Sequence, residues 1–169
     1  MIIRQEQQQD ITSIRKVNDL AFGRPVEGSI VDKLRERCDE FLSFVAVEQG
    51  LILGHILFTP AVLETKTGTI NGLGLAPMAV LPDHQRRGIG TKLANAAIRQ
   101  IKNTNCPFII VLGYPEYYPR FGFESAAQYS ITSEWNVPVE AFMIMILDKQ
   151  RMQNSSGIAK YRPEWNDAM

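Results

Sequence analysis

The sequence predicts a mixed α/β fold in which helices flank a central sheet. Residues 41–49 and 51–64 are rich in β-branched and aromatic side chains and joined by a tight connection, which is the pattern of a β-hairpin. Residues 70–80 and 108–113 are apolar runs that fit buried strands, and the segment between them has helical periodicity. Because a further apolar strand follows at 141–147, we expect one sheet to contain all of these strands.

The first part of the chain is expected to form a short strand and two helices. Residues 1–4 are a candidate opening strand. Asp10 is expected to cap the helix that follows, because apolar side chains recur there at helical spacing. Gly23 and Pro25 interrupt this pattern, and residues 29–38 give a second amphipathic helix with its apolar side turned inward.

The middle of the chain holds the hairpin and the strand–helix–strand segment. Pro60 lies inside the second hairpin strand, where a proline indicates an edge, a bulge or a break. A polar turn at 64–69 precedes the apolar run, and a helix is expected to start near Arg87. One face of that helix is apolar and carries Ile89, Leu93, Ala96, Ala97 and Ile101.

The last third of the chain is less regular. Residues 114–123 are aromatic and are expected to give one helical turn that leads into a strand. The polar tail at 152–165 carries two aromatic residues and is expected either to pack as an extended arm or to fray in part. The length of 169 residues fits a single domain, 1–169, with a core up to about residue 148 and an extension over 149–169.

The composition narrows the classes of function. Lys plus Arg equal Asp plus Glu at 18 each, so no net charge favours nucleic acid or an acidic membrane as a partner. No run of about 18 apolar residues is present, and the N-terminus has no signal-peptide pattern. Cys38 and Cys106 have no partner at metal-like spacing. We therefore expect a cytoplasmic protein with reduced thiols and no metal, and any anion site must be built locally.

The segment after Val80 carries the most informative pattern. Gly88 and Gly90 fall at the start of a helix, where missing side chains let the backbone approach a ligand. The first N–H groups of a helix have no intrahelical acceptor, and the helix dipole adds partial positive charge. Three side chains add further donors: Arg86, Arg87 and Thr91. Together these features predict a phosphate-binding site.

Two other nucleotide-binding signatures are absent. The Walker spacing G-x-x-x-x-G-K-[ST] does not occur in this segment. The dinucleotide signature G-x-G-x-x-G would need a third glycine at the position of Leu93. A lone G-x-G is a weak signal, so the loop alone indicates a phosphate group and not the molecule that carries it.

Two motifs together resemble those of the GNAT superfamily of N-acetyltransferases. Gln85-x-x-Gly88-x-Gly90 after a strand is similar to its coenzyme A signature, Q/R-x-x-G-x-G/A, and residues 117–123 resemble its aromatic Y-x-x-x-G-F element. The order of elements over about residues 1–148 also matches. Residues 112–123, the late strand at 141–147 and a Gly-x-x-x-Tyr pattern in the tail together most resemble a bacterial subgroup whose substrates are mostly unassigned. The resemblance implies a mixed, mostly antiparallel sheet of about six to seven strands, about four flanking helices, and splayed fourth and fifth strands.

The resemblance also implies how acetyl-CoA, the acyl donor, is bound. Its pyrophosphate would be held by backbone donors of residues 85–91: Gln85, Arg86, Arg87, Gly88, Ile89, Gly90 and Thr91. Its pantetheine arm would pair with the strand residues Met78, Ala79 and Val80. The thioester would lie where the fourth and fifth strands part, and an N–H of the same strip would stabilise the oxyanion. Pro77, which has no N–H, would suit a bulge or an unpaired ladder position just before it.

The implied reaction is attack of a neutral amine on the thioester, which requires an acid for the departing sulfur. Tyr118 stands where the family commonly keeps this acid, and a phenol with an ordinary pKa of about 10 is protonated at neutral pH. Glu27, in the loop between the first two helices, is the candidate base. Glu64 and Glu116 compete with it, and ordered water is the base in many family members.

Two further residues carry expectations. His55, a lone histidine in an apolar strand, is expected to be a satisfied core or edge residue and not a ligand. Gly113 ends the fifth strand where other branches of the family often have a polar residue, which leaves the acceptor side undefined.

The sequence thus predicts an N-acetyltransferase that moves the acetyl group of acetyl-CoA to a primary amine of a small molecule or a protein. The expected protein acts as a monomer or homodimer. A non-catalytic module that binds acyl-CoA as a sensor or regulator is the alternative, since its phosphate loop would be the same. A nucleotide-binding α/β domain is a third reading, and it would bind nucleotides that lack pantetheine.

Overall fold

The computed structural model describes residues 1–169, which divide into two compact units. Unit 1 comprises Met1–Phe58, Ala76–Gln100 and Pro163–Met169, and unit 2 comprises Thr59–Leu75 and Ile101–Arg162. The chain forms nine strands, three α-helices and several short 3₁₀ segments. None of the helices has both the length and the apolar character that crossing a membrane requires.

The strands form a mixed, mostly antiparallel sheet, as predicted. They are β1 (Ile2–Gln5), β2 (Leu42–Glu48), β3 (Leu51–Thr65), β4 (Gly68–Val80), β5 (Phe108–Leu112), β6 (Glu124–Ser125), β7 (Ile131–Ser133), β8 (Phe142–Ile146) and β9 (Gly157–Lys160). Hydrogen bonds join them in the order β1-β2-β3-β4-β5-β8-β6, and β9 pairs with β3 and β7. The ladders β4–β5 and β7–β9 are parallel, whereas β1–β2, β2–β3, β3–β9, β5–β8 and β6–β8 are antiparallel.

The expected number of about four helices is reached when the longest 3₁₀ segment is counted with the three α-helices. They are α1 (Ile11–Phe22), α2 (Val26–Arg37), α3 (Ile89–Lys102) and the 3₁₀ segment η6 (Pro163–Ala168). The shorter 3₁₀ segments are η1 (Gln8–Asp10), η2 (Pro82–His84), η3 (Tyr118–Phe121), η4 (Ala126–Tyr129) and η5 (Val139–Ala141). The strand count exceeds the expected six to seven because β6 and β7 are only two and three residues long and β9 lies in the tail.

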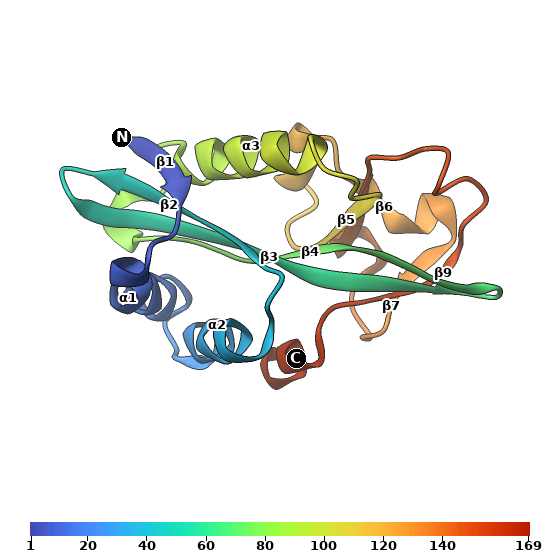
Figure 1. Ribbon diagram of the computed structural model, residues 1–169, viewed down its shortest axis with the longest axis horizontal. Helices are drawn as coiled ribbons and strands as arrows, with labels where there is room; N and C mark the ends of the chain where they lie inside the picture. The colour runs from blue at the N-terminus through green and yellow to red at the C-terminus, as the bar shows by residue number, and fades with distance from the viewer. The chain divides into compact units, whose positions relative to one another are not determined.

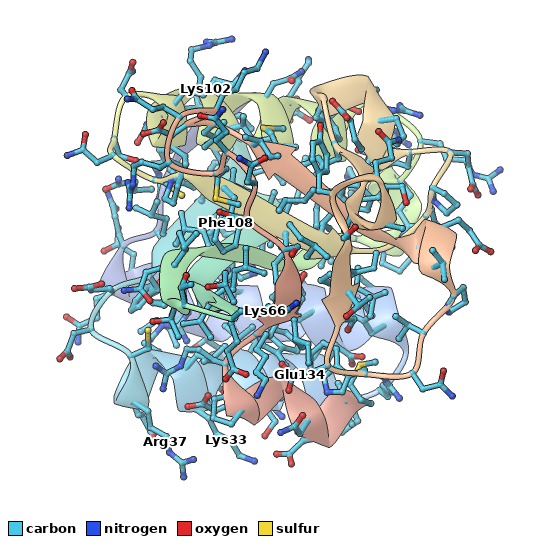
Figure 2. The ribbon with its side chains drawn as sticks, turned by 90° about the vertical axis from the view of Figure 1, so that its right-hand side faces the viewer. Lys33, Arg37, Lys66, Lys102, Phe108 and Glu134 are labelled. Carbon is cyan, nitrogen blue, oxygen red and sulfur yellow. The ribbon has the colours of Figure 1, made fainter.

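Helix α2 contacts both α1 and η6 within unit 1. Figure 1 shows α1 and α2 side by side, with the C-terminal segment next to α2. Lys33 of α2 forms an ion pair with Asp167 of η6 at 2.9 Å, and Figure 2 shows Lys33 and Arg37 pointing away from the ribbon. This contact surface explains why the last residues of the chain are ordered against α2.

Asp10 does not cap α1 with its side chain, contrary to the prediction. Its backbone is already helical, because the 3₁₀ segment η1 runs directly into α1. The buried carboxylate instead accepts hydrogen bonds from the backbone N–H of Gln7 at 2.7 Å and from Arg4 Nη1 at 2.6 Å. The Arg4 hydrogen bond lowers the pKa of Asp10 below its usual range. Asp10 therefore caps the start of η1 and ties it to β1.

The hairpin of β2 and β3 is confirmed, and it explains Pro60. Gln49 and Gly50 have φ of 50° and 78°, the left-handed conformation of a tight two-residue hairpin turn. The β2–β3 ladder ends at Phe58, and the β3–β9 ladder begins at Val62. Pro60 lies between the two ladders, so its missing N–H removes no hydrogen bond to either partner. β3 also pairs with β4, so Pro60 lies in an internal strand of the sheet, in the gap between the ladders to β2 and β9.

The tail does not fray. β9 pairs with β3 through Val62–Glu64 and with β7, so the tail adds a strand to unit 2. Tyr161 and Trp165, the two aromatic residues, are 7% and 5% exposed. Burial of both rings fixes the segment as a packed arm.

A chain of buried polar groups crosses unit 1. Asn18 Nδ2 donates to an α1 carbonyl and to His55 Nδ1, so the proton of the neutral His55 ring is on Nε2. His55 Nε2 donates to Ser43 Oγ at 3.0 Å, and the Ser43 hydroxyl donates to the Glu6 carboxylate. Arg35 closes the chain with an ion pair to Glu6 at 3.0 Å. His55 is fully buried with both ring nitrogens bonded, as the sequence predicts for a structural histidine.

Stability is expected to depend on pH through His55. Burial, and secondarily the Arg35 charge, lower the pKa of His55 from about 6.5 to about 3. Between these values the unfolded chain binds the extra proton, so the free energy of unfolding falls as pH falls, by up to about 1.4 kcal/mol per pH unit. Urea unfolding between pH 7.5 and 5.0 should show this slope in the wild type and a shallower one in His55→Gln. Equal slopes in the two proteins would contradict the assignment.

Candidate functional site

The loop predicted to bind phosphate is a turn with two left-handed residues. β4 ends at Val80, η2 follows, and α3 starts at Ile89. Arg86 and Gly88 have φ of 62° and 80°. A Cβ at Gly88 would meet nothing within 4 Å, so glycine is favoured there by the backbone conformation and not by crowding. The helix begins two residues after the predicted start, because these turn residues are not helical.

The turn places backbone N–H groups at the start of a helix. The backbone bond from Lys92 N to Gly88 O, at 3.0 Å, lies at the start of α3, and the first N–H groups of a helix have no acceptor within the helix. Arg86, Arg87 and Gly88 are exposed, whereas Ile89 is buried and Gly90 is half-buried. The 14-residue helix that follows adds the positive end of its dipole. The arrangement fits an anion with several oxygen acceptors, such as a pyrophosphate.

Gln85 donates two hydrogen bonds to backbone carbonyls just before the turn. Its side-chain Nε2 donates to the Val80 carbonyl at 3.0 Å, and its backbone N–H donates to Pro82 O at 3.3 Å. The backbone N–H of Gln85 and one of its two side-chain N–H donors are thus engaged by the protein. The glutamine of the motif therefore fixes the shape of the turn, a role that the sequence pattern did not reveal.

Close packing at Gly54 positions the start of α3 in unit 1. A Cβ at Gly54 would lie 2.9 Å from the Leu93 side chain, 3.2 Å from that of Ile89 and 3.2 Å from the Ala79 carbonyl oxygen. Only glycine lets β3 approach α3 and β4 this closely. Ala79 is buried in the predicted strip Met78, Ala79 and Val80, which forms the end of β4. The strip and the turn are therefore consecutive parts of one packed element in unit 1.

Tyr118 lies in unit 2, in the first position of η3. Its ring is 8% exposed and makes edge contacts with Tyr117 and Phe123, at centroid distances of 5.2 and 5.8 Å. A Cβ at Gly113 would overlap the Tyr118 ring, so Tyr118 accounts for the glycine that directly follows β5. Burial raises the pKa of Tyr118 above its usual value, with Tyr117 and Tyr114 adding to the effect. The phenol is thus protonated throughout the physiological pH range.

Glu27 was predicted to lie in a loop, but it lies in the first turn of α2. That helix starts at Val26, three residues earlier than the apolar pattern indicated, because the polar first turn carries few apolar side chains. The Glu27 side chain is buried, and its carboxylate accepts from Arg24 Nη2 at 2.5 Å and from Arg24 Nε at 3.0 Å. Both oxygens are engaged by one guanidinium group.

The competing carboxylates differ in their surroundings. Glu64, on β3, forms an ion pair with Lys160 of β9 at 3.0 Å, and Glu116 is exposed. No group of three or more His, Cys, Asp or Glu side chains is arranged to hold a metal ion.

Sequence reasoning missed one residue of this region of unit 2. The Tyr161 hydroxyl lies at the end of the β4–β5 ladder, where it bonds to the backbone of both strands. The sequence marked Tyr161 as an aromatic residue of the tail and as the tyrosine of a Gly-x-x-x-Tyr pattern, but not as a site residue. The pattern did not indicate these contacts, because the partners of Tyr161 are 49 and 86 residues away along the chain.

Comparisons with known proteins agree with this geometry. The acetyltransferase (GNAT) domain family matches residues 2–126. The N-acetyltransferase YjhQ of Escherichia coli is 38% identical over 122 residues, which are 70% of this chain and 66% of YjhQ, just under two thirds of its length. The N-acetyltransferase YhbS of the same species is 27% identical over 98% of this chain and 99% of YhbS.

Two solved structures share the fold. That of E. coli YhbS in complex with CoA has a TM-score of 0.88 at 26% identity, over 98% of this chain and 91% of the other. That of a GNAT family acetyltransferase from Brucella melitensis with acetyl-CoA has a TM-score of 0.78 at 31% identity, over 97% of both chains. The family match covers well over half of the sequence and includes the phosphate loop and Tyr118. This chain therefore belongs to the GNAT acetyltransferase family.

Proposed function

We propose that this protein transfers the acetyl group of acetyl-CoA to a primary amine. The observation that carries the proposal is the exposed turn at residues 86–88, which leads directly into the N-terminus of the 14-residue helix α3. Solved relatives at 26% and 31% identity contain CoA and acetyl-CoA, which supports the same donor here. Arg86 and Arg87 add the charge that a pyrophosphate needs in a chain with no net charge.

The donor is bound in two parts. The backbone N–H groups of the turn hold the pyrophosphate, Thr91 adds its hydroxyl, and Gln85 and Gly88 keep the turn in shape. The half-buried residues Met78 and Val80 and the backbone of Ala79 receive the pantetheine arm as an additional strand would be received. The same strip supplies a backbone N–H to the oxyanion.

The chemistry is a direct transfer. The neutral amine attacks the thioester carbonyl carbon, a C–N bond forms and the C–S bond breaks, and the sulfur leaves as a thiolate or thiol. Tyr118 serves as the acid. Because its pKa is raised, complete proton transfer to sulfur is costly, and its main contribution is a hydrogen bond to the developing thiolate.

The amine loses its proton to solvent and not to a preformed carboxylate base. Glu27 is already held by Arg24 through both oxygens, so it would have to break these bonds before it accepted a proton. Glu64 is paired with Lys160. An ordered water is the base that requires no such rearrangement, and Glu27 is the carboxylate to test against it.

Replacing Gly88 is expected to weaken donor binding. Alanine at a φ of 80° costs about 1–2 kcal/mol and turns the donors of the loop away from a bound pyrophosphate. We expect the Kd of coenzyme A, measured by isothermal titration calorimetry, to rise about tenfold or more in Gly88→Ala. Gly23→Ala is the matched control, because Gly23 has a φ of 67° and no atom near its Cβ position, yet it ends α1. An equal loss of affinity in both variants would contradict the assignment.

Removing the Tyr118 hydroxyl is expected to slow the transfer step. Tyr118→Phe keeps the packed ring, so kcat should fall about 100-fold or more while the KM for acetyl-CoA changes little. Thiol release from acetyl-CoA, followed with a panel of small amines and a peptide amine, provides the measurement. Tyr129→Phe is the control, since that hydroxyl donates to Glu124 at the surface.

The same assay separates the alternative functions. Tight coenzyme A binding without thiol release, and without any effect of Tyr118→Phe, would indicate a non-catalytic acyl-CoA sensor. Competition for the site by ATP or NAD as strong as that by coenzyme A would indicate a general nucleotide-binding domain.

A further inference from the structure

The parallel ladder between β4 and β5 ends at a side chain. It pairs Leu73, Gly74 and Leu75 with Ile109, Ile110 and Val111. At the next position the Leu112 N–H donates to the Tyr161 hydroxyl at 3.2 Å, and this hydroxyl donates to the Leu75 carbonyl oxygen at 2.9 Å. The Ile110 carbonyl oxygen, at 3.4 Å, is a second and weaker acceptor. A phenol thus occupies the place of the next rung.

This arrangement separates the strands without leaving a backbone group unpaired. In a continued ladder an N–H of β5 would donate directly to a carbonyl of β4 at about 2.9 Å. Here one oxygen atom stands between Leu112 and Leu75 and satisfies both, so the strands gain no free energy by closing. Two residues further along β4, Pro77 has no N–H with which to resume a ladder.

The Tyr161 ring is held firmly in this position. A Cβ at Gly74 would lie 2.6 Å from the ring, so the absence of a side chain there makes room for it. The Trp135 ring stacks on it at a centroid distance of 5.5 Å and an interplanar angle of 19°. Tyr161 directly follows β9, which pairs with β3 and β7. Burial raises the pKa of Tyr161, and Tyr118 adds to this, so the hydroxyl keeps the proton that it donates to Leu75.

We infer that Tyr161 is a positioning residue for acetyl transfer, whose hydroxyl fixes the point at which β4 and β5 part. By keeping Leu112 and Leu75 from pairing, it sets where the donor thioester can lie at the end of the ladder. This role rests on the proposed function, because it places the thioester of acetyl-CoA at that point. Tyr161 acts through the two strands and does not touch the reacting atoms.

The test is Tyr161→Phe, which removes one oxygen atom and keeps the ring. The freed Leu112 N–H and Leu75 carbonyl are expected to move toward each other, which displaces the thioester position by a fraction of the strand spacing. A misplacement of about 1 Å costs on the order of 100-fold in rate, so kcat per coenzyme A-binding site should fall about 10- to 100-fold. The KM for acetyl-CoA should rise far less, because the pyrophosphate turn is unchanged. Counting binding sites by titration removes any contribution from unfolded protein.

A second readout does not depend on activity. In the folded wild type the Leu112 amide is bonded to a phenol, and in Tyr161→Phe it is bonded to a carbonyl or to water. Its resonance and its hydrogen-exchange rate should therefore change, whereas those of Ile109 should not. Tyr129→Phe is the matched control for both readouts. If Tyr161→Phe fails to fold, Gly74→Ala decides, because it displaces the ring by steric contact and leaves the hydroxyl present.

The outcomes separate the two proposals. An active wild type with an equally active, folded Tyr161→Phe, or an unchanged Leu112 amide, would overturn the role of Tyr161. A wild type without any thiol release would overturn the proposed function, while the Leu112 amide would still report whether the hydroxyl separates the strands.

Discussion

Backbone groups without a backbone partner are the constraint on which the rest of this structure depends. At the end of the β4–β5 ladder the Leu112 N–H and Leu75 carbonyl are satisfied by the chain itself, through the Tyr161 hydroxyl. At the start of α3 the first N–H groups have no acceptor within the helix and can donate to a ligand. An unpaired group is costly only when it is buried, so the first set requires a side chain and the second tolerates solvent.

In the interior of unit 1, buried polar side chains likewise have hydrogen-bond partners within the chain. His55 stays neutral in the core because Asn18 and Ser43 use both of its ring nitrogens, and charge enters the chain of bonds only at Glu6. Arg35 balances that charge near the surface. A polar core of this kind gains little free energy over an apolar one, but it tolerates only one arrangement of α1, β2 and β3.

The sequence revealed those features that depend on neighbours along the chain. The strand–turn–helix around Gly88 was predicted because its glycines, arginines and helical periodicity lie within a dozen residues, and the hairpin and β5 were predicted for similar reasons. Features that depend on distant contacts were missed. Glu27 was misplaced because a polar first turn hides a helix start, Asp10 because its partner Arg4 lies on β1, and Tyr161 because its hydrogen-bond partners lie on other strands.

The Tyr118 ring fills the space that a side chain at position 113 would need, and this constrains which substitutions the two positions can accept in evolution. Any side chain at 113 overlaps the ring at 118, so neither position can be altered freely while the other keeps its present residue. Relatives that keep a buried ring at 118 should keep a glycine at 113, and those with a polar side chain at the end of β5 should carry a smaller or differently directed residue at 118. A substitution at position 113 that alters acceptor specificity would therefore require a matching substitution at position 118, which carries the acid.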